Sequence, residues 1–174
     1  MKHYDFAKKI HALFEQAVAR YSSGKRGADK FFSADELAFL TANGLAAQHL
    51  YDYAEDRNNH GEPDAETALA IECVRRDYFL NVQDGRVLAI VLDATTLPPK
   101  TAAVRGIAWL PRLLPKARAK LRGELPASLM FCCGGDRAFF QQHKIFPAEF
   151  LSLLWRHGED DAAITDWVER RSKS

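Results

Sequence analysis

The chain has 174 residues, of which 47% are apolar and 27% are charged, and its formal net charge is +1. This composition excludes an intrinsically disordered chain and a strongly basic polyanion-binding protein, and the length fits one or two compact domains. The N-terminus lacks the pattern of a secretory signal, no apolar run approaches the roughly 20 residues that cross a bilayer, and the three cysteines have no disulfide-framework spacing. We therefore expect a soluble, cytoplasmic protein with reduced thiols and no membrane partner.

The first part of the chain is predicted to be helical. Apolar residues recur at the helical period over residues 6–21 and stop before a Ser-Ser-Gly segment. Ser33 and Glu36 have the spacing of a capping box, which predicts that a second helix begins directly after Ser33. Two more helices are expected, one over about residues 46–57 and one from Pro63 onward.

The pattern changes after the fourth helix. Residues 78–82 and 87–92 are rich in aromatic and β-branched residues, and they flank Asp84-Gly85, a dipeptide typical of tight hairpin turns. We therefore predict a small β-hairpin near residues 78–92. The alternative continues the fourth helix to Gln83.

Four short helices are predicted in the second part of the chain. Trp109-Leu110-Pro111 opens the first of them, which ends near Leu121. The others are expected over residues 136–142, 147–156 and 161–171, because each of these segments starts with an acidic residue or a proline.

These elements predict a mainly α protein, a compact bundle of short helices with at most one small hairpin. We expect an N-terminal helical half, residues 1–93, and a C-terminal helical half, residues 94–174. No internal repeat is apparent in the sequence.

The C-terminal half contains several segments that belong together: Trp109-Leu110-Pro111-Arg112, residues 116–123, Cys133-Gly134-Gly135-Asp136, Phe150-Leu151 and Asp166-Trp167-Val168. With these segments, about residues 94–170 resemble the bacterial family catalogued as domain of unknown function 5069. The family has no established activity, so the resemblance implies no catalytic or binding residues. It implies a bacterial protein.

Basic residues concentrate in the helix predicted after Trp109. Between Asp93 and Glu124 seven residues are basic and none is acidic, whereas the rest of the chain has 17 basic and 23 acidic residues, a net charge of −6. Phosphate groups and acidic surfaces bind to such basic arrays. The candidate residues for binding an anion or a partner are Arg112, Lys116, Arg118, Lys120 and Arg122.

A helical wheel places these side chains beside the apolar arc of the helix. Lys116 and Lys120 lie on one side of the arc, and Arg118 and Arg122 flank the other side. If they are free, the partner is an acidic protein, a phosphate-bearing ligand or nucleic acid. The alternative is that they pair with the acidic remainder of the chain or are simply solvated.

Cys133, Gly134, Gly135 and Asp136 form a second candidate site. A cysteine near a helix N-terminus can become a reactive thiolate, and glycines let a ligand approach the backbone closely, so these residues could line a pocket. The sequence favours the alternative, in which both Cys132 and Cys133 are small buried residues and the glycines form a turn into a helix capped by Asp136.

The motifs of the commonest enzyme classes are missing from the sequence. There is no glycine-rich phosphate loop, no Gly-x-Ser-x-Gly elbow and no paired Cys-x-x-Cys zinc motif. His49, Asp52 and Asp56 share one helix face, but without a second set of ligands a solvated face is favoured. We therefore predict no cofactor, no metal and no catalytic residue. The favoured function is a non-enzymatic binding or interaction module that uses residues 112–122, and the alternative is a small thiol-dependent enzyme or redox sensor centred on Cys133.

Overall fold

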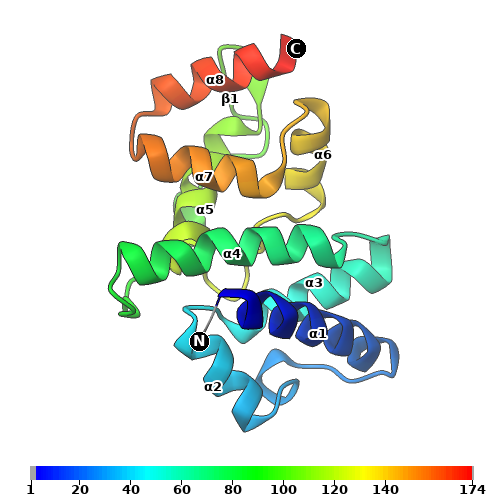
Figure 1. Ribbon diagram of the computed structural model, residues 1–174. Helices are drawn as coiled ribbons and strands as arrows, with labels where there is room; N and C mark the ends of the chain where they lie inside the picture. The colour runs from blue at the N-terminus through cyan, green and yellow to red at the C-terminus, as the bar shows by residue number, and fades with distance from the viewer. Residues whose placement is uncertain (1–2, 174) are drawn as a thin grey trace. The chain divides into compact units, whose positions relative to one another are not determined.

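The computed structural model describes residues 3–173 of the chain. Within this range the chain forms eight α-helices, two short 3-10 helices and one two-stranded antiparallel sheet (Figure 1). The prediction of a mainly α protein is confirmed. The contacts divide the chain into two compact units, Met1–Val87 (unit 1) and Leu88–Ser174 (unit 2), whereas a domain boundary at residues 93–94 stays a prediction. None of the described helices is both long and apolar enough to cross a membrane.

Unit 1 consists of four helices and begins its second helix where the capping box predicts. Ser33 Oγ accepts a hydrogen bond from the Glu36 amide at 3.3 Å, and the Glu36 carboxylate accepts one from the Ser33 amide at 2.7 Å. The elements are α1 (His3–Ser22), the 3-10 helix η1 (Ala28–Lys30), α2 (Ala34–Ala42), α3 (Ala47–His60) and α4 (Ala65–Asn81).

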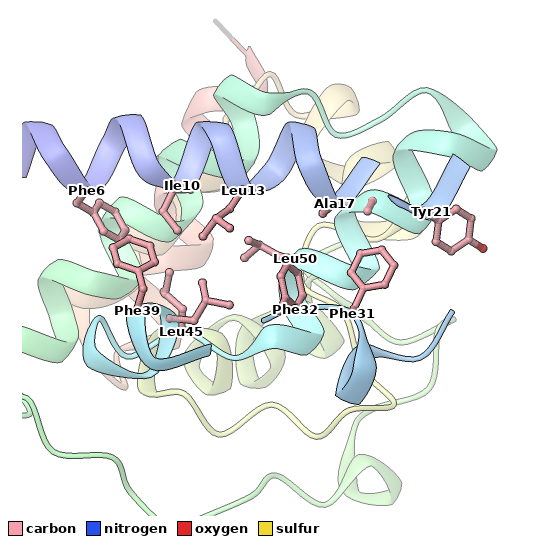
Figure 2. Close-up of a cluster of buried hydrophobic side chains, with 12 residues drawn as sticks. Phe6, Ile10, Leu13, Ala17, Tyr21, Phe31, Phe32, Phe39, Leu45 and Leu50 are labelled. Carbon is pink, nitrogen blue, oxygen red and sulfur yellow. The ribbon is translucent and has the colours of Figure 1, made fainter. Parts of the chain in front are cut away.

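The core of unit 1 is built on the apolar stripe of α1. Phe6, Ile10 and Ala17 are at most 1% exposed, and α1 packs against both α3 and α4. In Figure 2 Phe6 lies next to Phe39, and Ile10 and Leu13 point toward the side where Leu45 and Leu50 lie. The stripe that the sequence predicts is therefore the inward face of the helix.

The predicted hairpin near residues 78–92 is wrong. The fourth helix continues to Asn81, and its Phe79 is 2% exposed and packs so closely on Gly44 that a Cβ there would lie 2.3 Å from the ring. Asp84 and Gly85 both have positive φ, but the Gly85 amide bonds to the Phe79 carbonyl and so ends the helix. The Asp-Gly turn therefore closes a helix instead of joining two strands.

Unit 2 contains the hairpin, in a different place, and four more helices. β1 (Ala103–Val104) pairs with β2 (Ile107–Ala108) across Arg105-Gly106, whose two positive φ values suit a tight hairpin turn. The remaining elements are the 3-10 helix η2 (Ala94–Thr96), α5 (Leu110–Arg122), α6 (Gly134–Gln142), α7 (Pro147–His157) and α8 (Asp161–Lys173). α7 packs against both α5 and α8.

The two units repeat one local arrangement, although no repeat is apparent in the sequence. Both α2 and α6 have nine residues, and they begin at residues 34 and 134. The preceding residues have nearly equal backbone angles, φ −72° and ψ 165° at Ser33 and φ −66° and ψ 171° at Cys133. After each helix the residue in the left-handed region is Gly44 in unit 1 and Lys144 in unit 2.

Burial follows the same register in the first helix of each unit. Five buried positions of α1 recur 100 residues later in α5, namely Ile10, Leu13, Phe14, Ala17 and Tyr21 in α1 and Leu110, Leu113, Leu114, Ala117 and Leu121 in α5. Two of these five pairs are identical, Leu13 with Leu113 and Ala17 with Ala117. The repeat is easily missed in the sequence because burial is retained at all five positions while residue identity is retained at only two.

A polar contact also recurs between the second and fourth helices of the units. The residue that follows α2, Asn43, accepts a hydrogen bond from Arg76 of α4 at 2.7 Å. Its counterpart after α6, His143, lies 2.6 Å from the hydroxyl of Ser172 in α8. The correspondence therefore covers the burial register of the first helix, the start and end of the second helix and one polar contact to the fourth, whereas the packing of the fourth helix differs, on α1 in unit 1 and on α7 in unit 2.

Candidate functional site

The structure places the predicted basic helix in the interior of unit 2. Lys116 is 3% exposed and Lys120 is 0% exposed, so the expectation that both lie outside the packed side of the helix is wrong. The reason is that the burial of α5 is not confined to the apolar arc, because every residue from Lys116 to Leu121 is buried. A helical wheel describes a helix with one solvated side, and α5 lacks such a side over this stretch.

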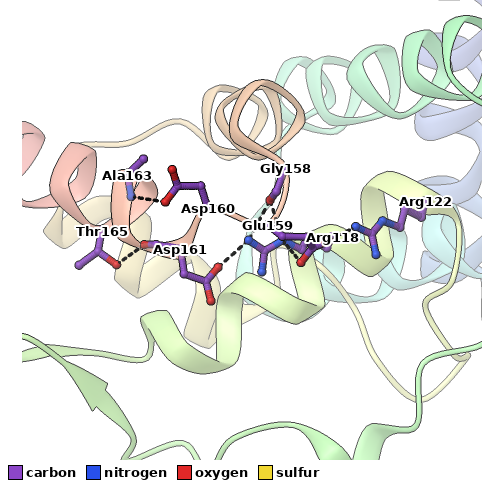
Figure 3. Close-up of polar contacts among 8 residues, drawn as sticks. All are labelled: Arg118, Arg122, Gly158, Glu159, Asp160, Asp161, Ala163 and Thr165. Carbon is purple, nitrogen blue, oxygen red and sulfur yellow. Dashed lines mark hydrogen bonds and ion pairs between the residues drawn. The ribbon is translucent and has the colours of Figure 1, made fainter.

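The arginines of the basic helix have acceptors within unit 2. Arg118 donates to the Gly158 carbonyl at 2.9 Å and to the Asp161 carboxylate at 2.5 Å, and Arg122 pairs with Glu159 (Figure 3). The hydrogen bond from Arg122 is the main reason why the pKa of Glu159 lies below its usual value.

The remaining arginine of the array also has an acceptor nearby. Arg112 donates to the carbonyl of Pro98 at 2.8 Å. These contacts favour the intramolecular alternative for the basic array, while its use for binding stays a prediction.

Lys116 brings the two predicted sites together. Its ammonium lies 2.7 Å from Asp136 Oδ2 and 3.1 Å from the Sγ of Cys133. Cys133 is the residue directly before α6, so its thiol lies at the N-terminus of that helix and is half-buried. A nucleophile, a cation and a carboxylate thus share one site.

Asp136 organises this site without capping α6 in the way the sequence predicts. The helix begins two residues earlier, at Gly134, and the carboxylate of Asp136 is 0% exposed. It accepts hydrogen bonds from the amide of Cys132 at 2.8 Å and from the indole of Trp109 at 3.0 Å, in addition to the ammonium of Lys116. Three donors therefore hold the carboxylate in one orientation.

The two adjacent cysteines differ in their surroundings. Cys132 is 0% exposed, as the alternative of small buried cysteines predicts, and burial raises the pKa of its thiol to about 12. Cys133 is only half-buried, so the prediction that both cysteines are buried is wrong for Cys133. The difference arises because Cys132, with φ +70°, turns the chain just before the helix begins.

Gly135 makes room for a neighbouring side chain. A Cβ at Gly135 would lie 2.4 Å from Cζ2 of Trp109, whereas at Gly134 the nearest atom would be 3.8 Å away. The sequence predicted that these glycines let a ligand approach the backbone. At Gly135 it is the indole ring of Trp109 that approaches closely. Trp109 itself has a φ of +70° directly before α5, a strained position for a bulky residue.

Sequence reasoning placed Trp109 at the start of a helix and missed it as a member of this site. The one signal in the sequence was that Trp109 directly precedes the helix that carries Lys116. The partnership of Lys116 and Asp136 could not be seen in this way, because the two residues belong to different helices. Among the described residues, no group of three or more His, Cys, Asp and Glu side chains could hold a metal ion.

Comparisons with known proteins address only the C-terminal half of the chain. Neither a curated protein nor a solved structure matches the chain. One family model matches, and the segments that carry the resemblance include Trp109, Lys116, Cys133 and Asp136, which meet in the site described above. Residues 95–174 are similar to the family described as Domain of unknown function (DUF5069).

Proposed function

We propose that this protein functions through the thiol of Cys133, as a redox sensor that reacts with hydroperoxides. The supporting observation is the 3.1 Å distance between Lys116 Nζ and Cys133 Sγ. Lys116 is buried and fixed by Asp136, so its charge is poorly screened by solvent and its position is defined. A cation and a helix N-terminus are the two surroundings in which proteins most often favour a cysteine thiolate.

The reaction needs no further group from the protein. The thiolate attacks one oxygen of the hydroperoxide, an S–O bond forms and the O–O bond breaks. The sulfur loses two electrons to the peroxide. The oxygen that is not bonded to sulfur leaves as hydroxide or alkoxide and takes a proton from water. The product is a sulfenic acid at Cys133, which a soluble thiol can reduce again.

A sensor is favoured over an enzyme because oxidation changes the charge next to Lys116. A thiolate is an anionic partner for the ammonium, whereas a sulfenic acid is largely neutral. Lys116 contacts the sulfur of Cys133 and pairs with Asp136, and α6 begins at the next residue. Oxidation would therefore alter the interactions of this ion pair and of the first turn of α6.

Binding through the basic helix has less support than the thiol function. Arg112, Arg118 and Arg122 have acceptors in unit 2, and Lys116 and Lys120 are buried. No observation of the described residues points to an external anion or an acidic protein at α5, and we therefore do not prefer this function.

The proposal can be tested by measuring the reactivity of each cysteine in the folded protein. We expect iodoacetamide to alkylate Cys133 first, and dimedone to trap a sulfenic acid there after hydrogen peroxide is added. Cys132 should stay protected because it is buried, and Cys73 should react slowly because burial raises its pKa. Mass spectrometry of peptides identifies the modified residue.

A double variant tests the contribution of the Lys116–Asp136 pair. In Lys116→Met/Asp136→Asn both charges of the pair are removed together, so no buried charge is left alone. We expect the alkylation and oxidation rates of Cys133 to fall at least about tenfold, while the exposed control Lys100→Met keeps the rates of the original protein. The proposal is wrong if Cys133 of the original protein reacts no faster than a free cysteine.

A further inference from the structure

A pocket opens on the surface of unit 2 where α7 and α8 meet. It has a volume of about 310 Å³ and is lined by Glu149 of α7 and by Trp167, Arg170 and Arg171 of α8. This volume lies at the lower end of small-ligand pockets, and the pocket is open to solvent, so it can cover one face of a single ring with a polar substituent. None of its residues belongs to the thiol site.

One of the two arginines is held in place by the protein. The Nε of Arg171 donates to the Lys144 carbonyl at 3.0 Å, and its Nη2 lies 3.5 Å from Glu149 Oε2. Glu149 in turn accepts a hydrogen bond from the amide of Phe146 at 3.3 Å, which anchors it to the start of α7. Arg171 and Glu149 therefore neutralise each other's charge, and backbone hydrogen bonds hold both side chains in place.

The other arginine leaves the pocket with a net positive charge. Arg170 is exposed, and the structure records no ion pair or hydrogen bond between it and another described residue. It lies on α8 next to Arg171 and three residues after Trp167, so a ligand that meets the indole also meets the guanidinium. An aromatic face beside an uncompensated guanidinium is complementary to a flat ring that carries an anionic group.

We propose that this pocket is a binding site for a small aromatic anion. The ring of the ligand packs on the indole of Trp167, and its carboxylate or phosphate accepts hydrogen bonds from Arg170. Guanidinium groups bind both kinds of anion through two parallel hydrogen bonds, which also orients the ring. The site is independent of Cys133, because their residues are different.

The test uses four probes that separate the ring from the charge. Benzoate and phenyl phosphate carry both features and distinguish a carboxylate from a phosphate. Cyclohexanecarboxylate keeps the charge without the aromatic ring, and benzamide keeps the ring without the charge. We expect benzoate or phenyl phosphate to shift the NMR signal of the Trp167 indole N–H at millimolar concentration, and the other two probes to bind at least about tenfold more weakly.

Two variants then assign the binding to these residues. Arg170→Gln should weaken the binding of the preferred probe about tenfold, because it removes the charge-assisted hydrogen bonds. Arg156→Gln, at an exposed position of α7, is the matched control and should leave the affinity unchanged. The proposal is overturned if neither aromatic anion shifts the Trp167 signal, or if Arg170→Gln binds the probe as tightly as the original protein.

Discussion

The residues that precede α2 and α6 have nearly the same backbone angles, but the side chains around them differ in chemistry. In unit 1, Ser33 and Glu36 form a capping box, and Arg20 of α1 lies 2.7 Å from Glu36. The side chains of this pair are 28% and 16% exposed, and the hydrogen bonds from Arg20 lower the pKa of Glu36 to about 2. Unit 1 therefore uses an ion pair with access to solvent to strengthen a helix cap.

In unit 2 the residue equivalent to Glu36, Asp136, also forms an ion pair with the first helix, but its cation lies four positions earlier in the 100-residue register than Arg20 does, and the pair is buried next to a thiol. Lys116 and Asp136 are also 2.7 Å apart, but their side chains are only 4% and 0% exposed. Asp136 is one methylene shorter than a glutamate, and it accepts from the amide of Cys132 instead of the amide at the cap position. Cys133 stands where unit 1 has Ser33. The comparison shows that an ion pair at the start of the second helix stabilises the helix cap in unit 1, whereas in unit 2 it holds a cation next to a nucleophile.

The largest expected effect comes from reversing the buried charge in unit 2. Lys116→Glu places a second carboxylate beside Asp136 without solvent, which should cost about 4 kcal/mol of unfolding free energy or more. Arg20→Glu, which reverses the cation of the more exposed pair in unit 1, should cost about 1 kcal/mol. Urea titration measures both.

The control for this prediction is Lys100→Glu, an exposed site of unit 2 where we expect a change below about 0.5 kcal/mol. If Lys116→Glu is as mild as this control, the ion pair of unit 2 is not buried in solution. The contrast between the two units would then disappear.

The second largest effect concerns the glycines at the start of α6, where unit 1 has Ala34 and Asp35. Gly135→Ala should cost about 2 kcal/mol, because its Cβ would lie 2.4 Å from the Trp109 ring. Gly134→Ala, with no atom nearer than 3.8 Å, should be neutral or add up to about 0.5 kcal/mol. Equal effects of the two substitutions on thermal unfolding would contradict the close packing of Trp109 on α6.

Local signals predicted the parts of the fold that depend on neighbouring residues. The capping box of Ser33 and Glu36 is confirmed, because both of its hydrogen bonds form within four residues. Asp84-Gly85 was correctly identified as a turn, but a turn alone does not decide whether strands or a helix precede it. Phe79 decided this by packing on Gly44, which is 35 positions away in the sequence.

The candidate site could be predicted only in part, for the same reason. The sequence identified Lys116, Cys133 and Asp136 as members of two separate sites. Nothing local indicated that α5 is buried on more than its apolar arc, or that Asp136 would accept from Lys116, 20 residues away. Wheel diagrams treat a charged residue outside the arc as solvated, and they fail where another helix supplies the counter-charge.

A smaller effect is expected from the cap residues themselves. Ser33→Ala should cost about 1 kcal/mol, because the amide of Glu36 loses its acceptor. Cys133→Ser should change stability by less than about 0.5 kcal/mol, since serine is a good cap residue and the Lys116–Asp136 pair remains. Urea titration measures the loss of unfolding free energy in both variants. Equal losses in Ser33→Ala and Cys133→Ser would contradict the different roles of these two cap residues.

The smallest expected effect is a pH dependence of the unfolding free energy that comes from His143, the residue after α6. Unit 1 has Asn43 at the equivalent position and should not show it. Burial lowers the pKa of His143 in the folded protein, because the charged imidazolium is poorly solvated there. Below the usual histidine pKa of about 6.5 the unfolded chain therefore binds more protons than the folded one, and stability is lost as the pH falls toward the lower folded value. In His143→Asn, which copies Asn43 of unit 1, this loss should be absent, while stability above pH 7 should change little. Urea titrations of both proteins between about pH 7 and pH 5 give the difference, and parallel curves would show that His143 is as well solvated in the folded protein as in the unfolded chain.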